Sequence, residues 1–222
     1  MIPAASEPGG RAATLKGHTA IFGGTFDPIH EAHLAMARAA ADGFALRRVL
    51  FVPASNPPHK SGIAMASWED RVRMVELACA VDPRFEVSRI EENANPSYSI
   101  LTIERLLAAE SGPLAFLIGA DAFAEIRTWY RWQDVIRLVD FIVVTRPGSS
   151  YDAPHGARVQ ELSGLDLPVS SSEIREEITL GRTDVPVPDS VFRYISENRL
   201  YQSSMRAHSL SSEKPDKNSS GR

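Results

Sequence analysis

The sequence predicts an α/β fold, in which a doubly wound, mainly parallel sheet is followed by a small helical part at the C-terminal end. Short β-branched or aromatic runs alternate with stretches of helical period from residue 19 to residue 145, the βαβα pattern of a parallel sheet. Apolar residues make up 43% and charged residues 23% of the chain, the usual mix of a globular domain. In such a sheet we expect the ligand site at the carboxyl ends of the strands.

The order of the expected elements follows these runs. The first helix has a start signal in Asp27, a candidate N-cap, followed by Pro28 at the first helical position, and it ends before Gly43. The second helix opens at Ser67 in the manner of a capping box and carries Cys79. The expected strands lie at residues 19–23, 48–53, 85–90, 114–119 and 141–145. Further helices are expected at residues 98–110, 132–138, 171–180 and 189–198, with no clear signal between residues 148 and 167.

Two terminal segments lack the pattern of a folded domain. Residues 1–18 and 202–222 are rich in Ser, Gly, Pro and charged residues and show no apolar periodicity. Burial cannot offset the entropy of ordering such segments, so we expect both to be disordered tails. One domain of the 222-residue chain is therefore expected over residues 19–201.

Charge and cysteine content exclude several classes of function. The net charge of −4 and the pI near 5.9 give no overall attraction to nucleic acid or to anionic lipid. The single cysteine, Cys79, excludes an internal disulfide and a multi-cysteine zinc site, and it is compatible with a reducing compartment. No run approaches the roughly 18 to 20 apolar residues of a membrane-spanning helix, and the first residues lack a secretory signal. The cytoplasm is the expected location.

The most informative motif is GGTFDPIHEAH at residues 23–33, where the first strand passes into the first helix. Adjacent glycines permit close backbone approach to a ligand, and the amides at a helix start favour an anion. His30 and His33 are three residues apart, so they share one helical face and can donate to the same phosphate chain. The simpler alternative is a tight turn followed by two surface histidines. Two histidines without a third ligand make a poor zinc site.

This motif resembles the signature of bacterial nicotinate mononucleotide adenylyltransferase, a family of the nucleotidyltransferase superfamily with a Rossmann-like fold. The resemblance implies that His30 and His33 stabilise the reacting phosphates. It also implies ATP contacts for the start of the motif, Gly23, Gly24, Thr25 and Phe26. At Ala32 the family has glycine, which lets the nucleotide lie close against the helix, so the added methyl group predicts a looser fit for ATP.

A second motif, VSSSEIR at residues 169–175, combines hydroxyls at a helix start with an arginine one turn later. Free amides, hydroxyl donors and a forked cation suit a phosphate cradle, although a serine N-cap with a solvent-facing arginine is the alternative. The motif resembles the family's second phosphate motif. The resemblance implies that Ser171 and Ser172 bind the triphosphate and that Arg175 holds the departing pyrophosphate.

Two shorter elements follow the second and fourth strands. The stiff loop NPPHK at residues 56–60 delivers Lys60 to the strand ends, where a solvated surface lysine is the alternative. Asp121, after Gly119, suits a contact to ribose hydroxyls or a cap on the next helix. In the resembling family a similar loop faces the phosphates and a glycine-x-aspartate element contacts the nucleotide, which implies those roles for Lys60, Gly119 and Asp121; His59 carries over only weakly.

The pyridine pocket is predicted from residues 95–99 and 128–130. A Trp-Tyr pair is more often part of a core, but Arg127 and Arg131 flank this one, which suits the rim of a pocket. The resemblance implies that Trp129 stacks on the pyridine ring. It also implies that Ser99 and the backbone amide of Tyr130 bind the ring carboxylate.

The expected activity is transfer of the adenylyl group of ATP to nicotinate mononucleotide, giving deamido-NAD and pyrophosphate, with Mg²⁺ carried by the ATP phosphates and no protein metal ligand. Two alternatives stay open. One is an adenylyltransferase of the same superfamily acting on another phosphate acceptor such as phosphopantetheine. The other is a nucleotide-binding regulator with weakened catalysis, of which Ala32 would be the first sign. The sequence does not determine the oligomeric state.

Overall fold

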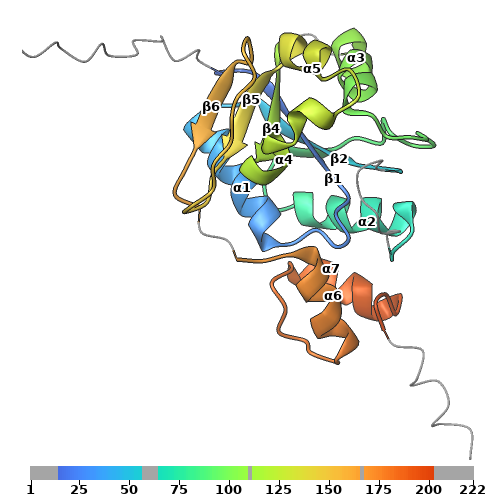
Figure 1. Cartoon of the computed structure of the whole chain (residues 1–222). Coiled ribbons are helices and arrows are strands. Elements are labelled where there is room, and N and C mark those ends of the chain that lie inside the picture. Colours follow the sequence, from blue (N-terminus) through green and yellow to red (C-terminus); the bar gives the residue numbers. More distant parts are fainter. Residues whose placement is uncertain (1–14, 57–64, 110–111, 166–167, 203–222) are drawn as a thin grey trace, which may run out of the picture.

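The computed structural model describes residues 15–56, 65–109, 112–165 and 168–202. They form a sheet of six strands in the order β3-β2-β1-β4-β5-β6, and every neighbouring pair is parallel (Figure 1). The strands are β1 Thr19–Gly24, β2 Arg48–Pro53, β3 Phe85–Val87, β4 Leu114–Gly119, β5 Asp140–Val144 and β6 Val159–Leu162. The predicted doubly wound α/β fold is confirmed.

The strand order reverses between β1 and β4, which creates a crevice at their carboxyl ends. The two strands pair from Thr19 opposite Leu114 to Ile21 opposite Phe116. Both strands continue for three more residues without pairing to each other, to Gly24 and Gly119. Ligands of open α/β sheets bind at such a reversal point.

Helices cover both faces of the sheet because the strands are apolar on both sides. Ala20 and Phe22 of β1 pack in one cluster with α1 and α2, whereas Ile21 packs in a second cluster with α3 and α5. The helices of this layer structure are α1 Glu31–Gly43, α2 Trp68–Cys79, α3 Ser99–Ala109, the short α4 Ala120–Ala124, the 3-10 turn η1 Ile126–Thr128 and α5 Trp132–Leu138.

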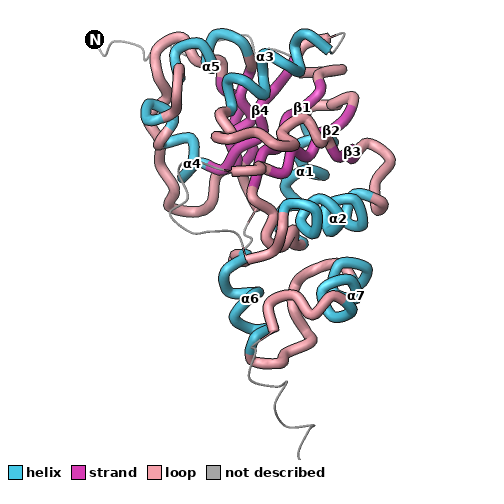
Figure 2. Tube along the Cα trace, turned by 90° about the vertical axis from the view of Figure 1, so that its right-hand side faces the viewer, coloured by secondary structure: helices cyan, strands magenta, loops and turns pink. Residues whose placement is uncertain are grey.

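The C-terminal helical part consists of α6 Ser171–Thr179 and α7 Asp189–Glu197, which lie together below α2 (Figure 2). Val191 and Ile195 of α7 are buried. The Tyr194 hydroxyl donates a hydrogen bond of 2.9 Å to the Asp70 carboxylate on α2. This part therefore packs directly on the helical layer that also contains α1.

Three sequence predictions differ from the structure. The first helix starts at Glu31 with His30 as its N-cap, not at Asp27 and Pro28, because the Asp27 carboxylate accepts hydrogen bonds from distant parts of the chain instead. The strand expected at residues 85–90 ends at Val87, since two turns follow it at residues 89–94. Residues 148–167, which carried no clear signal, contain the edge strand β6.

The described residues also bear on the terminal segments and on Cys79. Of the expected N-terminal tail only residues 15–18 are described, and there Leu15 is buried in the core, so packing begins before Thr19. Cys79 is buried on α2, as predicted for its helix. Within the part of the chain that the structure describes, no helix is both long and apolar enough to span a membrane.

Candidate active site

A cavity of about 520 Å³ opens at the crevice between β1 and β4. Its wall is built by segments that are far apart in the sequence: the end of β1 with the following turn, the start of α1, the end of β4, the start of α3, the turn before α5 and the start of α6. From these come ten of the predicted site residues, Gly23, Gly24, Thr25, Phe26, His33, Ser99, Gly119, Trp129, Tyr130 and Ser171. The fold therefore brings most of the sequence-predicted site to one place.

The two histidines stack at the start of α1. Their ring centroids lie 3.7 Å apart, and the backbone amide of His30 donates a 3.3 Å hydrogen bond to Nδ1 of His33. Because Nδ1 of His33 accepts this bond, neutral His33 carries its proton on Nε2. The ring of His33 also packs against the edge of Phe26, 5.1 Å between centroids. His33 thus presents a hydrogen-bond donor in a fixed orientation at the cavity wall.

His30 lies behind His33 and does not line the cavity. Its side chain is buried, and burial together with the positive charge of Arg146 lowers the pKa of His30 to about 4. The imidazole is therefore neutral near pH 7. Its Nδ1 has no hydrogen-bond partner among the described residues. Two cationic imidazoles at this separation would repel each other, so a neutral His30 is what permits the stack.

The glycine pair is explained in part by packing. A Cβ atom at Gly24 would come within 2.9 Å of the Phe26 ring. Phe26 is buried, and its backbone adopts the left-handed conformation at φ 51°. A Cβ atom at Gly23 would lie 3.6 Å from the Phe116 ring, which is an ordinary van der Waals contact. Gly23 also lines the cavity. Gly24 therefore makes room for Phe26, whereas Gly23 exposes backbone to a ligand.

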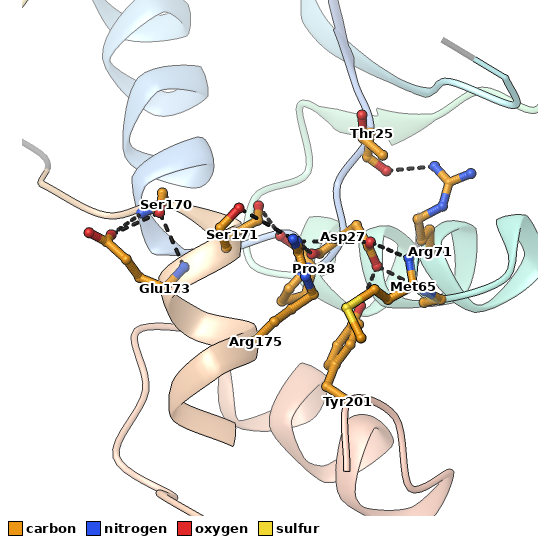
Figure 3. Close-up of polar contacts among 12 residues, drawn as sticks. Thr25, Asp27, Pro28, Met65, Arg71, Ser170, Ser171, Glu173, Arg175 and Tyr201 are labelled. Carbon is orange, nitrogen blue, oxygen red and sulfur yellow. Dashed lines mark hydrogen bonds and ion pairs between the residues drawn. The ribbon is translucent and has the colours of Figure 1, made fainter. Parts of the chain in front are cut away.

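Buried charged residues hold the turn between β1 and α1. Arg71 of α2, almost fully buried, donates to the backbone oxygens of Thr25 at 2.6 Å and Ala54 at 2.8 Å. The Asp27 carboxylate accepts from the Tyr201 hydroxyl at 2.7 Å and the Met65 amide at 2.8 Å (Figure 3). These long-range bonds fix the backbone that leads to His30.

The start of α6 docks on the same turn. Ser170 caps the helix in a capping box with Glu173. The Ser171 hydroxyl donates to the backbone oxygen of Pro28 at 3.0 Å, and Arg175 donates to that of Asp27 at 2.6 Å (Figure 3). Ser171 and Arg175 are thus tied to the turn that precedes the histidines, as a shared phosphate site requires.

Trp129 also lines the cavity and packs edge-on against Phe116, with 5.7 Å between ring centroids. Tyr130 stacks at 4.6 Å on Tyr98, next to Ser99 at the first turn of α3. The flanking arginines are engaged elsewhere: Arg127 pairs with Asp152, and Arg131 pairs with Glu104 and Asp134. Among the described residues that line the cavity there is neither Arg127 nor Arg131.

Five predicted site residues lie away from the cavity wall or outside the described residues: His30, Arg175, Asp121, Ser172 and Lys60. Asp121 is exposed in the first turn of α4, where Gly119 is the N-cap, so it neither caps the helix nor lines the cavity. Ser172 is exposed and accepts from Arg175 at 3.3 Å. Lys60, with His59, lies outside the described residues. Their contacts to the nucleotide stay predictions.

The sequence of this chain is similar to those of known proteins. Residues 21–177 match the family model described as cytidylyltransferase-like. A probable nicotinate-nucleotide adenylyltransferase from Solibacter usitatus (strain Ellin6076) is 56% identical over 184 residues, covering 82% of this chain and 98% of the relative. Another from Geobacillus kaustophilus (strain HTA426) is 43% identical and covers 83% of this chain and 86% of the relative. The chain belongs to the nicotinate-nucleotide adenylyltransferase family.

The fold also resembles a solved structure of Plasmodium falciparum nicotinic acid mononucleotide adenylyltransferase complexed with NaAD. The TM-score is 0.68 at 19% sequence identity, and the match covers 83% of this chain and 97% of that chain. At that identity the likeness supports the fold alone.

Ala32, the departure from the family signature, is buried on α1. Its side chain is not part of the cavity wall. The methyl group therefore packs within the protein and does not narrow the cavity. The looser fit for ATP stays a prediction.

Sequence reasoning missed several groups of the site. Glu91 and Thr102 line the cavity, and the Thr102 hydroxyl donates to Oε1 of Glu91 at 2.6 Å. Oε2 of Glu91 is buried without a hydrogen-bond partner among the described residues. Arg146, two residues after β5, lies close enough to His30 to affect its pKa. The sequence offered one signal for Arg146, namely that a cationic residue follows closely after the end of a predicted strand, where ligands of such sheets bind.

Proposed function

We propose that the protein transfers the adenylyl group of ATP to nicotinate mononucleotide, giving deamido-NAD and pyrophosphate. One observation carries the proposal: a single cavity is lined by His33 of the histidine motif and also by Ser99 and Trp129. A phosphate site and an aromatic site in one cavity suit a mononucleotide with a flat ring. The family membership of the chain supports the same reaction.

In the proposed reaction the phosphate of the mononucleotide attacks the α-phosphorus of ATP, and pyrophosphate departs. Phosphoryl-type transfer of this kind needs positioning and charge stabilisation more than covalent work by the protein. His33 supplies an Nε2 donor that the His30 amide holds in orientation, and His30 supports it as a neutral imidazole. Donors fixed before the reaction stabilise the developing charge without reorganisation.

Arg175, together with Ser171, Ser172 and Lys60, is assigned to the triphosphate and the leaving pyrophosphate. Arg175 already lies on the turn before the histidines, through its bond to the Asp27 backbone oxygen. Among the described residues no group of three His, Cys, Asp or Glu side chains could hold a metal ion. Mg²⁺ usually keeps several waters and takes phosphate oxygens as ligands, so in the proposed reaction it would be held by the ATP phosphates and would neutralise their charge.

The pyridine end favours an acid over an amide. Ser99 is the first residue of α3, so its hydroxyl and the helix start offer donors to a carboxylate. A carboxamide brings N–H groups of its own, which would face these donors unpaired. Trp129 supplies a ring face for either substrate.

A panel of phosphate acceptors tests the proposal. The purified protein is incubated with ATP, Mg²⁺ and either nicotinate mononucleotide, nicotinamide mononucleotide or phosphopantetheine, and released pyrophosphate is measured. We expect the highest specificity constant for nicotinate mononucleotide. Preference for phosphopantetheine would assign the chain to another branch of the superfamily, and nucleotide binding without pyrophosphate release would indicate a regulator. The cytoplasm stays the expected location.

A further inference from the structure

Tyr201 connects the C-terminal end of the described chain to the signature turn. It lies outside residues 21–177, which match the family model, and its side chain is buried. Its hydroxyl donates to Oδ1 of Asp27 at 2.7 Å (Figure 3). Its backbone oxygen accepts from the Thr179 hydroxyl at 2.8 Å. Thr179 is the last residue of α6, the helix that carries Arg175. Tyr201 therefore contacts both the turn and the helix that Arg175 joins.

Asp27 is a buried carboxylate whose negative charge is stabilised by several hydrogen-bond donors and by a nearby cation. Besides Tyr201 it accepts from the backbone amides of Met65 at 2.8 Å and Ala66 at 3.2 Å. The guanidinium of Arg175 lies 3.9 Å from its Oδ2, a longer contact than the 2.6 Å bond of Arg175 to the Asp27 backbone oxygen. Arg175 thus lies between a carbonyl that orients it and a carboxylate that attracts it.

Loss of the tyrosine hydroxyl would change that balance. Oδ1 of Asp27 would keep only the 3.2 Å bond from Ala66, and a buried carboxylate with fewer donors needs its neighbouring cation more strongly. The burial of Tyr201 and the nearby Asp27 charge raise the pKa of its hydroxyl, so Tyr201 remains a donor across the working range of pH. The hydroxyl and Arg175 therefore compete for one carboxylate.

We propose that Tyr201 is a positioning residue, whose hydroxyl satisfies Asp27 and so leaves the charge of Arg175 available to the pyrophosphate part of the nucleotide. The inference rests on the proposed function for its kinetic consequence. Its binding consequence, the affinity for inorganic pyrophosphate, does not depend on which acceptor the protein uses.

The test is the Tyr201→Phe variant of the full chain, which keeps the ring and removes the hydroxyl. The matched control is Tyr194→Phe, because Tyr194 also donates to a carboxylate, Asp70 at 2.9 Å, but this bond joins α7 to α2 and does not involve Asp27. Isothermal titration calorimetry measures the dissociation constant of pyrophosphate, and initial rates give kcat/KM for ATP and KM for nicotinate mononucleotide.

We expect Tyr201→Phe to weaken pyrophosphate binding and to lower kcat/KM for ATP by roughly five- to tenfold, the scale of one typical intramolecular hydrogen bond. KM for nicotinate mononucleotide should stay unchanged, and Tyr194→Phe should match the unmodified protein in all three values. Equal values for Tyr201→Phe and the unmodified protein, or an equal loss in both variants, would overturn the inference.

Asp27→Asn separates competition from simple support of the fold, and it also serves if Tyr201→Phe does not fold. The amide removes the charge that attracts Arg175, so pyrophosphate affinity should equal or exceed that of the unmodified protein. A weakened affinity would show that Asp27 only supports the turn and would overturn the inference. The pyrophosphate affinities of the unmodified protein and its variants can differ as expected while the unmodified protein makes no deamido-NAD. In that case the proposed function fails and the role of Tyr201 stands.

Discussion

One backbone amide determines how His33 faces the cavity. The N–H of His30 occupies Nδ1 of His33 and leaves the proton on Nε2, while the edge of Phe26 fixes the ring from the side. His30 itself is buried and neutral. At the residue scale the site therefore combines an oriented Nε2 donor on His33, a buried neutral His30 stacked on it and the cation of Arg175.

Substitution of either histidine should slow the reaction more than it weakens substrate binding. We expect His33→Ala to lower kcat by about a hundredfold to a thousandfold, roughly 3 to 4 kcal/mol, because it removes one preorganised donor. We expect His30→Ala to lower kcat as well, because it removes the ring that stacks on His33. Steady-state kinetics measures kcat, and calorimetry with ATP measures binding. A near-normal kcat in either variant would show that the substituted histidine does not contribute to catalysis.

The lowered pKa of His30 makes folding stability depend on pH. The pKa falls from 6.5 in the unfolded chain to about 4 in the folded protein, so the unfolded chain takes up the proton first as the pH decreases. Stability from this residue is complete above pH 6.5 and is lost toward pH 4. Between about pH 7.5 and pH 5 the loss should be about 2 kcal/mol.

Urea unfolding at both pH values measures this loss, with His30→Asn as the control that cannot titrate. The unmodified protein should lose about 2 kcal/mol more than the control. If both proteins lose the same stability, His30 titrates normally and is not buried as described.

The two sides of the pyridine pocket should have separable effects on selectivity. Trp129→Ala should weaken nicotinate and nicotinamide mononucleotides by a similar factor, because stacking does not depend on the ring substituent. Ser99→Ala should penalise the acid selectively, by about 1 to 3 kcal/mol. Specificity constants for both substrates measure this. An undiminished preference for the acid in Ser99→Ala would place the selectivity at another group of the wall.

Local sequence patterns predicted the residues of the site whose role is local, and they missed those that act across the chain. Gly23, His33 and Ser171 stand at junctions of strand and helix, where the chemistry of the residue and its position agree. Glu91 and Tyr201 enter the site through contacts to Thr102 and Asp27, which only the tertiary structure establishes. No spacing rule links residues 11 or 174 positions apart.

At the scale of elements, the helix starts do most of the positioning. α1, α3 and α6 each begin at the cavity, with His33, Ser99 and Ser171 in their first turns. The start of α1 was predicted too early because Asp27 and Pro28 form a good local start signal, which the distant partners of Asp27 override. The edge strand β6 was missed because it is short and only partly buried.

Neighbouring serines at the start of α6 should have different roles. Ser170 caps the helix through a bond to the Glu173 amide, so Ser170→Ala should cost about 1 kcal/mol of stability and leave KM for ATP unchanged. Ser171 lines the cavity and holds Pro28, so Ser171→Ala should raise KM for ATP several-fold by loss of a donor. Chemical denaturation and steady-state kinetics on both variants compare them. Equal kinetic effects would contradict the division of roles.

At the scale of the whole molecule, the reversal of strand order between β1 and β4 accounts for the position of the site. Segments from both faces of the sheet end at the crevice, and Ser171 at the start of α6 lines the cavity there. The C-terminal helices α6 and α7 lie below α2 (Figure 1). The parallel βαβα pattern of the sequence was sufficient to predict this edge as the site. The docking of α6 and α7 was not predicted, since it depends on side chains such as Tyr194 and Arg175.

The central claim is a single direct transfer, in which the substrate phosphate attacks and the protein only positions and stabilises. ATP carrying a chiral α-phosphorothioate, with Mg²⁺ and nicotinate mononucleotide, tests it in one measurement. The account predicts a dinucleotide product whose α-phosphorus has inverted configuration, as one in-line displacement requires. Retained configuration would mean two displacements and a covalent adenylyl-enzyme, and absence of the dinucleotide would mean a different reaction; either result would contradict the account.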